Sequence, residues 1–407
     1  MKPTSETTSL FANFGKLFIG LVFVQFINFF FSLILPKYIQ PTAFAEFGIF
    51  LSIIYILTEI INAKIDMAVF LGKSVEEAQQ IANAAIGIAC ILFCFLLVIS
   101  AISFFFVPVI FITIPFVVLL YGIHQPIIAF LNKQEKYNII NYFRIIQVIL
   151  TASATLILAM QHIEHALIYG FLFGLACATL YSKFYIKFSF NQEEIKKIWK
   201  QFSQFPKFGI WSSLLNNVSR NSIPLLMSPF FSMSNIGFYT YATRLLNAPT
   251  GSFSSALSQV YFKKASELNG KELLQTTKNT ILFSFIIGII PSLIILFFGK
   301  DIFFFLFSSE WMEAGKIAQY LILWYFTGII ISPISSLLDI KYLLKFEFNF
   351  NLVLLLARFS AILIGGLFDQ FYLAILLFAI VGVLANLGLL YYIYFRILRD
   401  DIRSASR

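Results

Sequence analysis

The sequence predicts an all-α, polytopic membrane protein with about twelve transmembrane helices, arranged as two halves of six. The composition is the first reason: of 407 residues, 59% are hydrophobic and 12% are charged, whereas an ordinary soluble domain carries about 25% charged residues. The mean hydropathy is +0.86. The second reason is a series of long apolar runs, and the third is an internal repeat. Together these features exclude a soluble enzyme, a disordered chain and a secreted disulfide scaffold.

The apolar runs are long enough to span a membrane. A bilayer core is about 30 Å thick, so a helix that crosses it needs roughly 20 mostly apolar residues. The three cysteines lie inside such runs, which favours small core residues over disulfides or a zinc site. The predicted spans are residues 14–35, 43–63, 84–106, 109–131, 139–160, 166–187, 208–231, 236–260, 279–299, 317–338, 347–366 and 371–395.

The distribution of Lys and Arg residues predicts the orientation, because cytoplasmic loops of membrane proteins carry an excess of both. With the N-terminus inside, only Lys37, Lys300 and Lys316 fall on the outer side, and three arginines fall within spans. All the other basic residues fall on the inner side, which predicts that the N- and C-termini are both cytoplasmic. The net charge of +9 is therefore a topology signal, and no nucleic-acid partner is expected.

Two pairs of similar segments relate the two halves of the chain. Phe11 to Gly15 opens the first span, and Phe205 to Gly209 opens the seventh in the same way. The turn at Pro41 to Phe47 matches the turn at Met233 to Tyr239 at nearly the same offset. Six spans in each half indicate a parallel repeat, whose axis lies along the membrane normal.

The segment between the halves, residues 191–206, predicts an amphipathic helix in the cytoplasmic interface. Apolar residues such as Ile195 and Ile198 share one helical face, and three lysines share the opposite face. A solvated linker with ordinary basic residues is the alternative interpretation. The chain is therefore divided into an N-terminal six-helix lobe at 1–190, this linker, and a C-terminal six-helix lobe at 207–407.

The sequence offers no catalytic, cofactor or metal motif. It lacks a Gly-x-Gly-x-x-Gly segment, a P-loop, a nucleophile elbow and an Asp-x-Asp pair. His162 and His165 lie with Glu164 in a short outer loop, where metal ligation is the less favoured interpretation. His124, in the fourth span, is interpreted as a packing residue or a cavity liner. We therefore predict neither an enzyme nor a bound cofactor or metal.

Three arginines, Arg220, Arg244 and Arg358, fall inside predicted spans. An Arg at the centre of a spanning helix costs at least ~2.5–3.5 kcal/mol, so it needs partners or water. In one interpretation Arg220 or Arg358 pairs with Glu59 or with carbonyls freed by Pro224. In the other, the arginines line a water-filled cavity and bind an anion. The second is favoured for Arg220 and Arg358, because few carboxylates lie at that depth; for Arg244 the two are balanced.

Polar side chains on neighbouring turns extend this candidate site. Amides on the seventh span suit sugar hydroxyls, and a Glu-x-x-x-x-Lys-x-Asp segment ends the second span. The candidate coupling or gating residues are Glu59 and Asp66. The candidate substrate-binding residues are Arg220, Arg358, Arg244, Asn216, Asn217, Asn28, Gln25 and Lys64.

Two segments carry a family resemblance. The first runs from Lys64 to Ala78, where Lys64 and Asp66 stand for the family's Arg and Glu. The second runs from Gly237 to Leu246 and on from Ser255 to Glu267, close to the family pattern throughout. Both resemble bacterial oligosaccharide flippases of the Wzx (O-antigen translocase) type, within the multidrug/oligosaccharidyl-lipid/polysaccharide exporter superfamily. The span count, the repeat and the orientation extend the resemblance to the whole chain.

The resemblance implies two six-helix lobes around a central cavity that opens to alternate sides of the bacterial inner membrane. The implied substrate is an undecaprenyl-pyrophosphate-linked oligosaccharide, an O-antigen or capsule repeat unit, and arginine binds pyrophosphate through paired hydrogen bonds. Only Arg244 and the Lys64–Asp66 pair are carried over by position. The implied partners are membrane lipids and the polysaccharide polymerase and glycosyltransferases of the same pathway. H⁺ and Na⁺ stay open as coupling ions.

Two other functions compete with this interpretation. A multidrug antiporter of the same superfamily needs acidic residues deep in a lobe, but Glu59 is the one clear intramembrane acid in this sequence. A membrane polysaccharide polymerase usually has a large outer loop that works on the glycan, and the outer loops here are short. The flippase is therefore the favoured function.

Overall fold

The computed structural model describes residues 20, 22–103, 109–341 and 343–399. The first part of the predicted first span, with the repeat segment Phe11 to Gly15, and the end of the predicted third span lie outside these residues. Within the described part every regular element is a helix, which confirms the all-α prediction.

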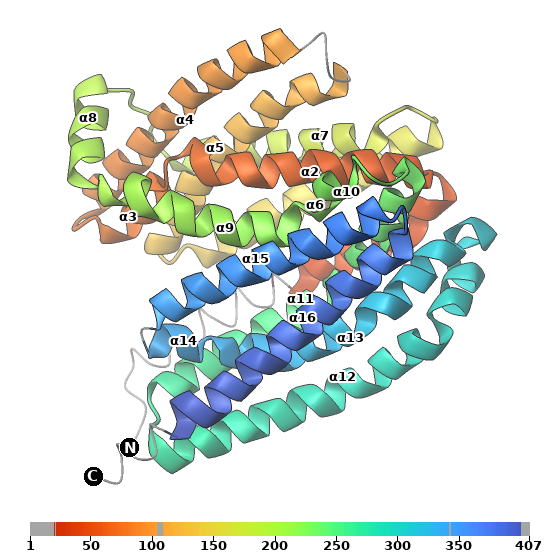
Figure 1. The fold of residues 1–407 in the computed structure, drawn as a ribbon. Coiled ribbons are helices and arrows are strands. Elements are labelled where there is room, and N and C mark those ends of the chain that lie inside the picture. The colour runs from red at the N-terminus through yellow and green to blue at the C-terminus, as the bar shows by residue number, and fades with distance from the viewer. Residues whose placement is uncertain (1–19, 21, 104–108, 342, 400–407) are drawn as a thin grey trace. The chain divides into compact units, whose positions relative to one another are not determined.

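Each predicted span coincides with helical structure in the described residues (Figure 1). The connecting helices include α3 (Ile65–Ala68), α8 (Gln192–Gln201) and α14 (Leu337–Ile340). The spanning helices are the N-terminal helix Val22–Lys37, α2 (Pro41–Ile61), α4 (Val75–Ser103), α5 (Ile114–Lys133), α6 (Tyr137–Met160), α7 (Ala166–Ser182), α9 (Ile210–Asn221) with α10 (Ile223–Met227), α11 (Met233–Ser266), α12 (Gly270–Phe307), α13 (Met312–Ser335), α15 (Leu344–Leu367) and α16 (Phe371–Tyr392).

Nine helices in the described residues are long and apolar enough to cross a membrane. The three predicted spans outside this group are the N-terminal helix, α9 with α10, and α11. The first is described only from Val22 onward, the second is interrupted at Ser222, and the third is rich in polar residues. These three spans carry six of the eight candidate substrate-binding residues. Of these six residues, Arg244 lies on the polar helix α11, and Arg220, Asn216 and Asn217 lie on the interrupted seventh span.

Local sequence explains where α4 begins and where the seventh span breaks. The Ser74 hydroxyl accepts a hydrogen bond from the Glu77 N–H (3.1 Å), and the Glu77 carboxylate accepts one from the Lys73 N–H (2.7 Å). This reciprocal arrangement is a capping box, which satisfies the free N–H groups at a helix start.

In the seventh span, Pro224 lacks the N–H that would continue the helix, and α9 ends at Asn221.

The helices form two compact units. Unit 1 comprises residues 1–31 and 46–225, and unit 2 comprises residues 32–45 and 226–407. Neither unit is a single stretch of chain, because residues 32–45 belong to unit 2. α9 belongs to unit 1, although it opens the second half of the repeat. The predicted lobe boundary at the linker 191–206 stays a prediction.

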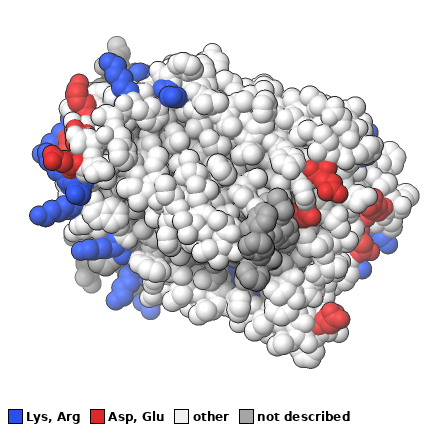
Figure 2. All heavy atoms as spheres, turned by 90° about the horizontal axis from the view of Figure 1, so that it is seen from above, with Lys and Arg blue, Asp and Glu red and all other residues white. Residues whose placement is uncertain are grey.

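The surface of the helices is that of a membrane protein. Ile91, Phe95, Val98 and Ile102 recur at helical spacing on α4, and each is more than half exposed. Figure 2 shows charged side chains gathered toward the two ends of one face, with Lys and Arg mainly at one end. The belt between them carries neither sign of charge. An exposed apolar belt with charged ends is the pattern that a bilayer requires.

α8 lies against the end of α4 that begins at Val75 (Figure 1). Its Asn191 side chain accepts a hydrogen bond from the Glu193 N–H (3.0 Å), which caps the helix start. Ile198 is buried in an apolar cluster with residues of α3, α4 and α5. Trp199 remains 43% exposed on the outside. This amphipathic helix is anchored by one face, and its location in the membrane interface stays a prediction.

α6 and α7 pack closely at two glycines of α7 that are four residues apart. A Cβ atom at Gly170 would lie 2.1 Å from the Thr155 hydroxyl and 2.7 Å from the Thr155 backbone nitrogen. A Cβ atom at Gly174 would lie 2.1 Å from the Thr151 hydroxyl. Such close approach of two backbones is how small residues support helix association in membranes.

Replacing Gly170 by Ala is therefore expected to destabilise unit 1 by about 1–3 kcal/mol, because the new methyl group meets backbone that cannot move aside. The measurement is thermal unfolding of the purified protein in detergent. Gly388→Ala in α16 is the matched control, because a Cβ atom there meets nothing within 4 Å. Equal melting temperatures for the two variants would contradict the close packing of α6 on α7.

Candidate functional site

The turn after α2 is fastened to two other helices by a buried amide. Asn62 is 1% exposed, and its side-chain N–H groups donate to the carbonyls of Ala85 on α4 (3.1 Å) and Gly122 on α5 (2.8 Å). The Gly122 carbonyl is available because Pro126, four residues later, has no N–H to bond it. A proline inside one span thus provides the acceptor that holds the end of another.

This turn brings a cation back onto a carboxylate. Ala63 and Lys64 have φ values of 49° and 59°, in the left-handed region that residues with a side chain seldom adopt. The reversal places the Lys64 ammonium group in an ion pair with the Glu59 carboxylate, and the two side chains are only 14% and 18% exposed. Among the described side chains, the ion-pair partner of Glu59 is therefore this lysine.

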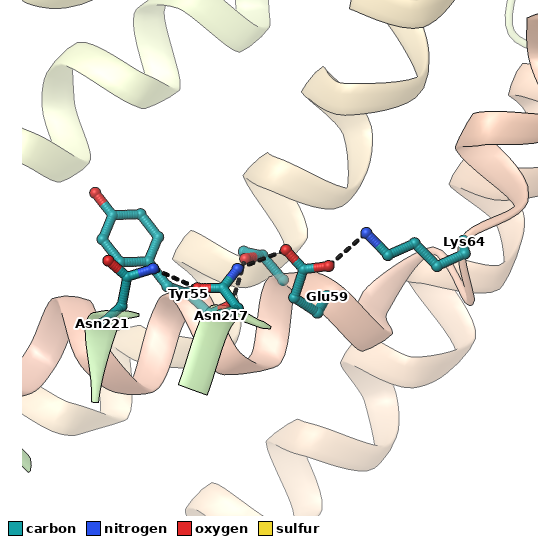
Figure 3. A network of polar contacts seen from close by, with 6 residues as sticks. Tyr55, Glu59, Lys64, Asn217 and Asn221 are labelled. Atoms are coloured by element: carbon teal, nitrogen blue, oxygen red, sulfur yellow. Dashed lines mark hydrogen bonds and ion pairs between the residues drawn. The ribbon is translucent and has the colours of Figure 1, made fainter. Parts of the chain in front are cut away.

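A chain of amides continues from Glu59 into α9 (Figure 3). The Asn217 side chain donates to the second Glu59 carboxylate oxygen (2.5 Å), and the Asn221 side chain donates to the Asn217 amide oxygen. The Ser52 hydroxyl on α2 donates to the Asn221 backbone carbonyl (2.6 Å). We call Ser52, Glu59, Lys64, Asn217 and Asn221 the Glu59 network. It joins α2 to α9 within unit 1.

Asp66 lies on α3, next to this network. Burial raises the pKa of the Asp66 carboxyl group, and the nearby Lys64 ammonium group acts against that increase by lowering it. The Glu59 carboxylate raises the pKa of Asp66 further, because two like charges repel. Two carboxylates that share one lysine can exchange a proton or bind a small cation, which is the chemistry expected of a coupling site.

In unit 2, Arg244 on α11 is held by a serine. Its Nε–H donates to the Ser32 hydroxyl (3.0 Å), and the Tyr241 hydroxyl donates to the Ser32 backbone carbonyl (2.8 Å). Ser32 and Tyr241 are both buried. Tyr241 packs against Trp311 with a 4.5 Å ring separation. A rigid aromatic cluster therefore fixes the segment that orients Arg244.

Arg358 on α15 is buried in unit 2, with 7% of its surface exposed. Its guanidinium carbon lies 5.2 Å from the ring centre of Trp324 and 5.3 Å from that of Phe378. These distances are typical of cation–π interactions, which offset part of the free-energy cost of burying the charge away from water. Arg358 thus sits among aromatic rings of its own unit. Whether it binds an anion stays a prediction.

The remaining candidates divide into two groups. Gln25 and Asn28 are half-buried on the N-terminal helix. The backbone of α9 carries Asn216 and Arg220, but their side chains lie outside the described part of the structure. The structure therefore brings Glu59, Lys64, Asp66 and Asn217 together in unit 1, and it places Arg244 and Arg358 in unit 2 with different neighbours.

Sequence reasoning missed one basic group inside a span, Arg144. Arg144 was counted among the residues at the cytoplasmic ends of spans, but it lies two turns inside α6, close to His124 on α5. The signal was a polar stripe at helical spacing on one face, formed by Asn141, Arg144, Gln147 and Thr151.

His165, in the loop between α6 and α7, contacts an acid. The His165 Nδ1 atom lies 2.8 Å from a carboxylate oxygen of Glu46, and both side chains are partly exposed. Among the described residues, no group of three or more His, Cys, Asp or Glu side chains is placed to hold a metal ion. His165 therefore has a partner that explains its position.

Within the described residues, long apolar helices and charged side chains inside them are the features of a multi-pass membrane protein. The chain belongs to the polysaccharide biosynthesis protein family, which matches residues 34–316. The search of curated proteins finds no match.

Solved structures of two kinds have the same fold. The lipid II flippase MurJ in an inward closed conformation is similar with a TM-score of 0.73 at 18% identity, over 95% of this chain and 90% of that chain. An inward-facing multidrug resistance MATE family transporter of the MOP superfamily has a TM-score of 0.71 at 14% identity, over 93% and 95%. A MOP superfamily transporter from Pyrococcus furiosus, described as having a binding pocket of reverse polarity, has a TM-score of 0.57 at 12% identity, over 95% of each chain. The chain therefore has the fold of a MOP superfamily transporter.

Proposed function

We propose that this protein is a flippase that moves an undecaprenyl-pyrophosphate-linked oligosaccharide, an O-antigen or capsule repeat unit, across the bacterial inner membrane by alternating access. The family match and the MurJ-like fold support a lipid-linked saccharide as the substrate class. The observation that carries the proposal is the surplus of permanent cations inside spans. Arg144, Arg244 and Arg358 lie within spanning helices, whereas the Glu59 carboxylate is already paired with Lys64.

In this proposal the arginines bind the anionic part of the substrate. A guanidinium group presents a planar fork of N–H donors that matches two phosphate oxygens at once. Arg358, Arg244 and Arg220 bind the pyrophosphate or an acidic sugar, and the amides of Asn216, Asn217, Gln25 and Asn28 bind sugar hydroxyls. The protein transports its substrate without chemical change. Its N- and C-termini are cytoplasmic, and it works with the glycosyltransferases and polymerase of its pathway.

A multidrug antiporter is the second candidate, because MATE transporters share the fold. Cationic drugs need acidic residues at the binding site, since a carboxylate offsets the cost of moving their charge into the membrane. The described part of the chain pairs its intramembrane carboxylate Glu59 with Lys64, and it buries Arg358. The charge balance therefore favours an anionic substrate.

The test is complementation of a strain that lacks its O-antigen flippase. Expression of this protein is expected to restore surface glycan, and its removal from its own host should cause a lipid-linked glycan to accumulate at the inner leaflet. The same strains are grown with cationic drugs as the control for the rival function. Increased drug resistance without restored glycan would contradict the flippase and support the antiporter.

A further inference from the structure

Arg144 is a cation inside a spanning helix that the proposed arginine site does not use. It lies seven residues after the start of α6, about 10 Å along the helix at 1.5 Å per residue. Its side chain is half-buried. The Nη1 atom is fully buried and forms no hydrogen bond with any described group. A guanidinium group inside a spanning helix normally has such bonds, because an unsatisfied donor there costs several kcal/mol.

His124 lies beside it on the adjacent helix α5. The ring is 8% exposed, and its edge packs on the Phe143 ring with centres 5.9 Å apart. The positive charge of Arg144 acts on this ring electrostatically. The Nδ1 atom of His124 is also buried and has no hydrogen-bond partner among the described groups. Two buried nitrogens without partners thus belong to neighbouring basic side chains.

The surroundings hold these two side chains in place. The Phe143 ring packs edge-on against Tyr181 at the end of α7 and against Tyr185 just after it, with ring centres 5.4 and 5.6 Å apart. The two tyrosine hydroxyls lie 3.1 Å apart, within hydrogen-bond distance. One turn before Arg144, Asn141 packs directly against Gly20 of the N-terminal helix. The pair is therefore built on rigid packed helices and not on a loop.

Arg144 has no carboxylate partner among the described residues. The ion pairs found there are those of Glu59 with Lys64 and of Glu46 with His165, so neither involves Arg144 or His124. A guanidinium charge in a low-dielectric environment is stabilised when an anion binds to it, and a neutral imidazole beside it can still donate one N–H to that anion. A phosphoryl group fits best, because it accepts from an arginine fork and from an imidazole N–H at the same time.

We propose that Arg144 and His124 form an anion subsite in unit 1 that binds a phosphoryl group of the lipid-linked substrate. The subsite rests on the proposed function and adds to it a second anion position, separate from the arginines of unit 2. Arg144 lies about two turns into α6 from the helix start at Tyr137. Free phosphate has the same chemistry, and the experiment separates the two sources.

The experiment measures binding of three probes to the full-length protein purified in detergent: undecaprenyl pyrophosphate, undecaprenol and inorganic pyrophosphate. The wild type is expected to bind undecaprenyl pyrophosphate more tightly than undecaprenol. Arg144→Gln should weaken binding of the pyrophosphate lipid about 10- to 100-fold, as expected for loss of a charged hydrogen bond. Binding of undecaprenol should not change. His124→Phe should weaken the same probe by a smaller factor.

Arg399→Gln is the matched control, because Arg399 is exposed near the C-terminal end of the described chain. Its binding should equal that of the wild type. Arg144→Lys keeps the charge without the fork and should lose less than about 10-fold, so the inference remains testable even if Arg144→Gln folds poorly.

The outcomes separate the two proposals. If the wild type binds undecaprenyl pyrophosphate and Arg144→Gln and Arg144→Lys bind it equally well, the subsite is wrong while the proposed function stands. If the wild type does not distinguish undecaprenyl pyrophosphate from undecaprenol, both proposals fail. If only inorganic pyrophosphate depends on Arg144, the site binds free phosphate and the lipid source is wrong.

Discussion

Arg358→Gln is expected to reduce surface glycan at least about 100-fold per molecule of membrane protein. A guanidinium group that makes two charged hydrogen bonds to pyrophosphate contributes about 1.5–3 kcal/mol for each, and every 1.4 kcal/mol is a tenfold change. The Trp324 and Phe378 rings, 5.2 and 5.3 Å from the Arg358 guanidinium carbon, hold its orientation. Gln keeps a polar side chain of similar length but removes the charge and the fork.

Other substitutions at this position rank by charge. Arg358→Lys keeps the charge but loses the planar fork and the stacking on two rings, so partial export should remain. Arg358→Glu should be worst, because a carboxylate repels the phosphates. Arg244→Gln should be milder, since the Arg244 Nε atom already donates to Ser32. The measurement is surface glycan produced by each variant, divided by its abundance in the membrane.

A purely structural arginine would give a different result. Arg358 is buried within unit 2, so a structural arginine replaced by Gln would lower the unfolding temperature and leave substrate binding unchanged. Thermal unfolding in detergent separates the two effects. Arg399→Gln, which removes an exposed arginine near the end of the chain, is the control and should export normally. If Arg358→Gln and Arg220→Gln both export normally at equal abundance, these arginines are not the anion site.

Much of the fold could be predicted from the sequence, because bilayer thickness imposes one length on every apolar run. The effect of each proline on its helix was harder to predict. Pro224 interrupts the seventh span, but Pro126 and Pro291 lie inside continuous helices. At Pro126 a neighbour takes up the freed carbonyl, because the Asn62 side chain donates to Gly122, the residue four before this proline. That neighbour is distant in the chain, so the local sequence around the proline does not reveal it.

The candidate site was predictable residue by residue but not as an arrangement. Glu59 and Asn217 each stood out as polar groups in apolar runs, and the hydrogen bond between them joins positions 158 apart in sequence. Arg144 was predicted to lie at the cytoplasmic end of its span, because span boundaries read from sequence are uncertain by a few residues. The structure places it two turns inside α6. The rings around Arg358 were not predicted, since 18% of the chain is aromatic and no single ring stands out.

Glu59→Gln is expected to abolish coupled export while leaving the protein folded. The Gln side chain still offers an oxygen to the Asn217 amide, so the contact between α2 and α9 persists. What it removes is the negative charge that pairs with Lys64 and that a proton or Na⁺ would neutralise during transport. Glu59→Ala removes the oxygen as well and leaves the Lys64 charge buried without its partner, which should cost roughly 3 kcal/mol of stability.

The measurements are surface glycan per molecule and its response to ionophores that collapse the H⁺ or the Na⁺ gradient. Wild-type export should fall with one of the two ionophores, and that ionophore identifies the coupling ion. Glu46→Gln is the matched control, because Glu46 is a carboxylate on the same helix whose partner is His165. That variant should export normally. A Glu59→Gln protein that still exports at the wild-type rate, with the same ionophore sensitivity, would show that the Glu59 network only joins α2 to α9, since coupling requires a group whose charge the ion can change.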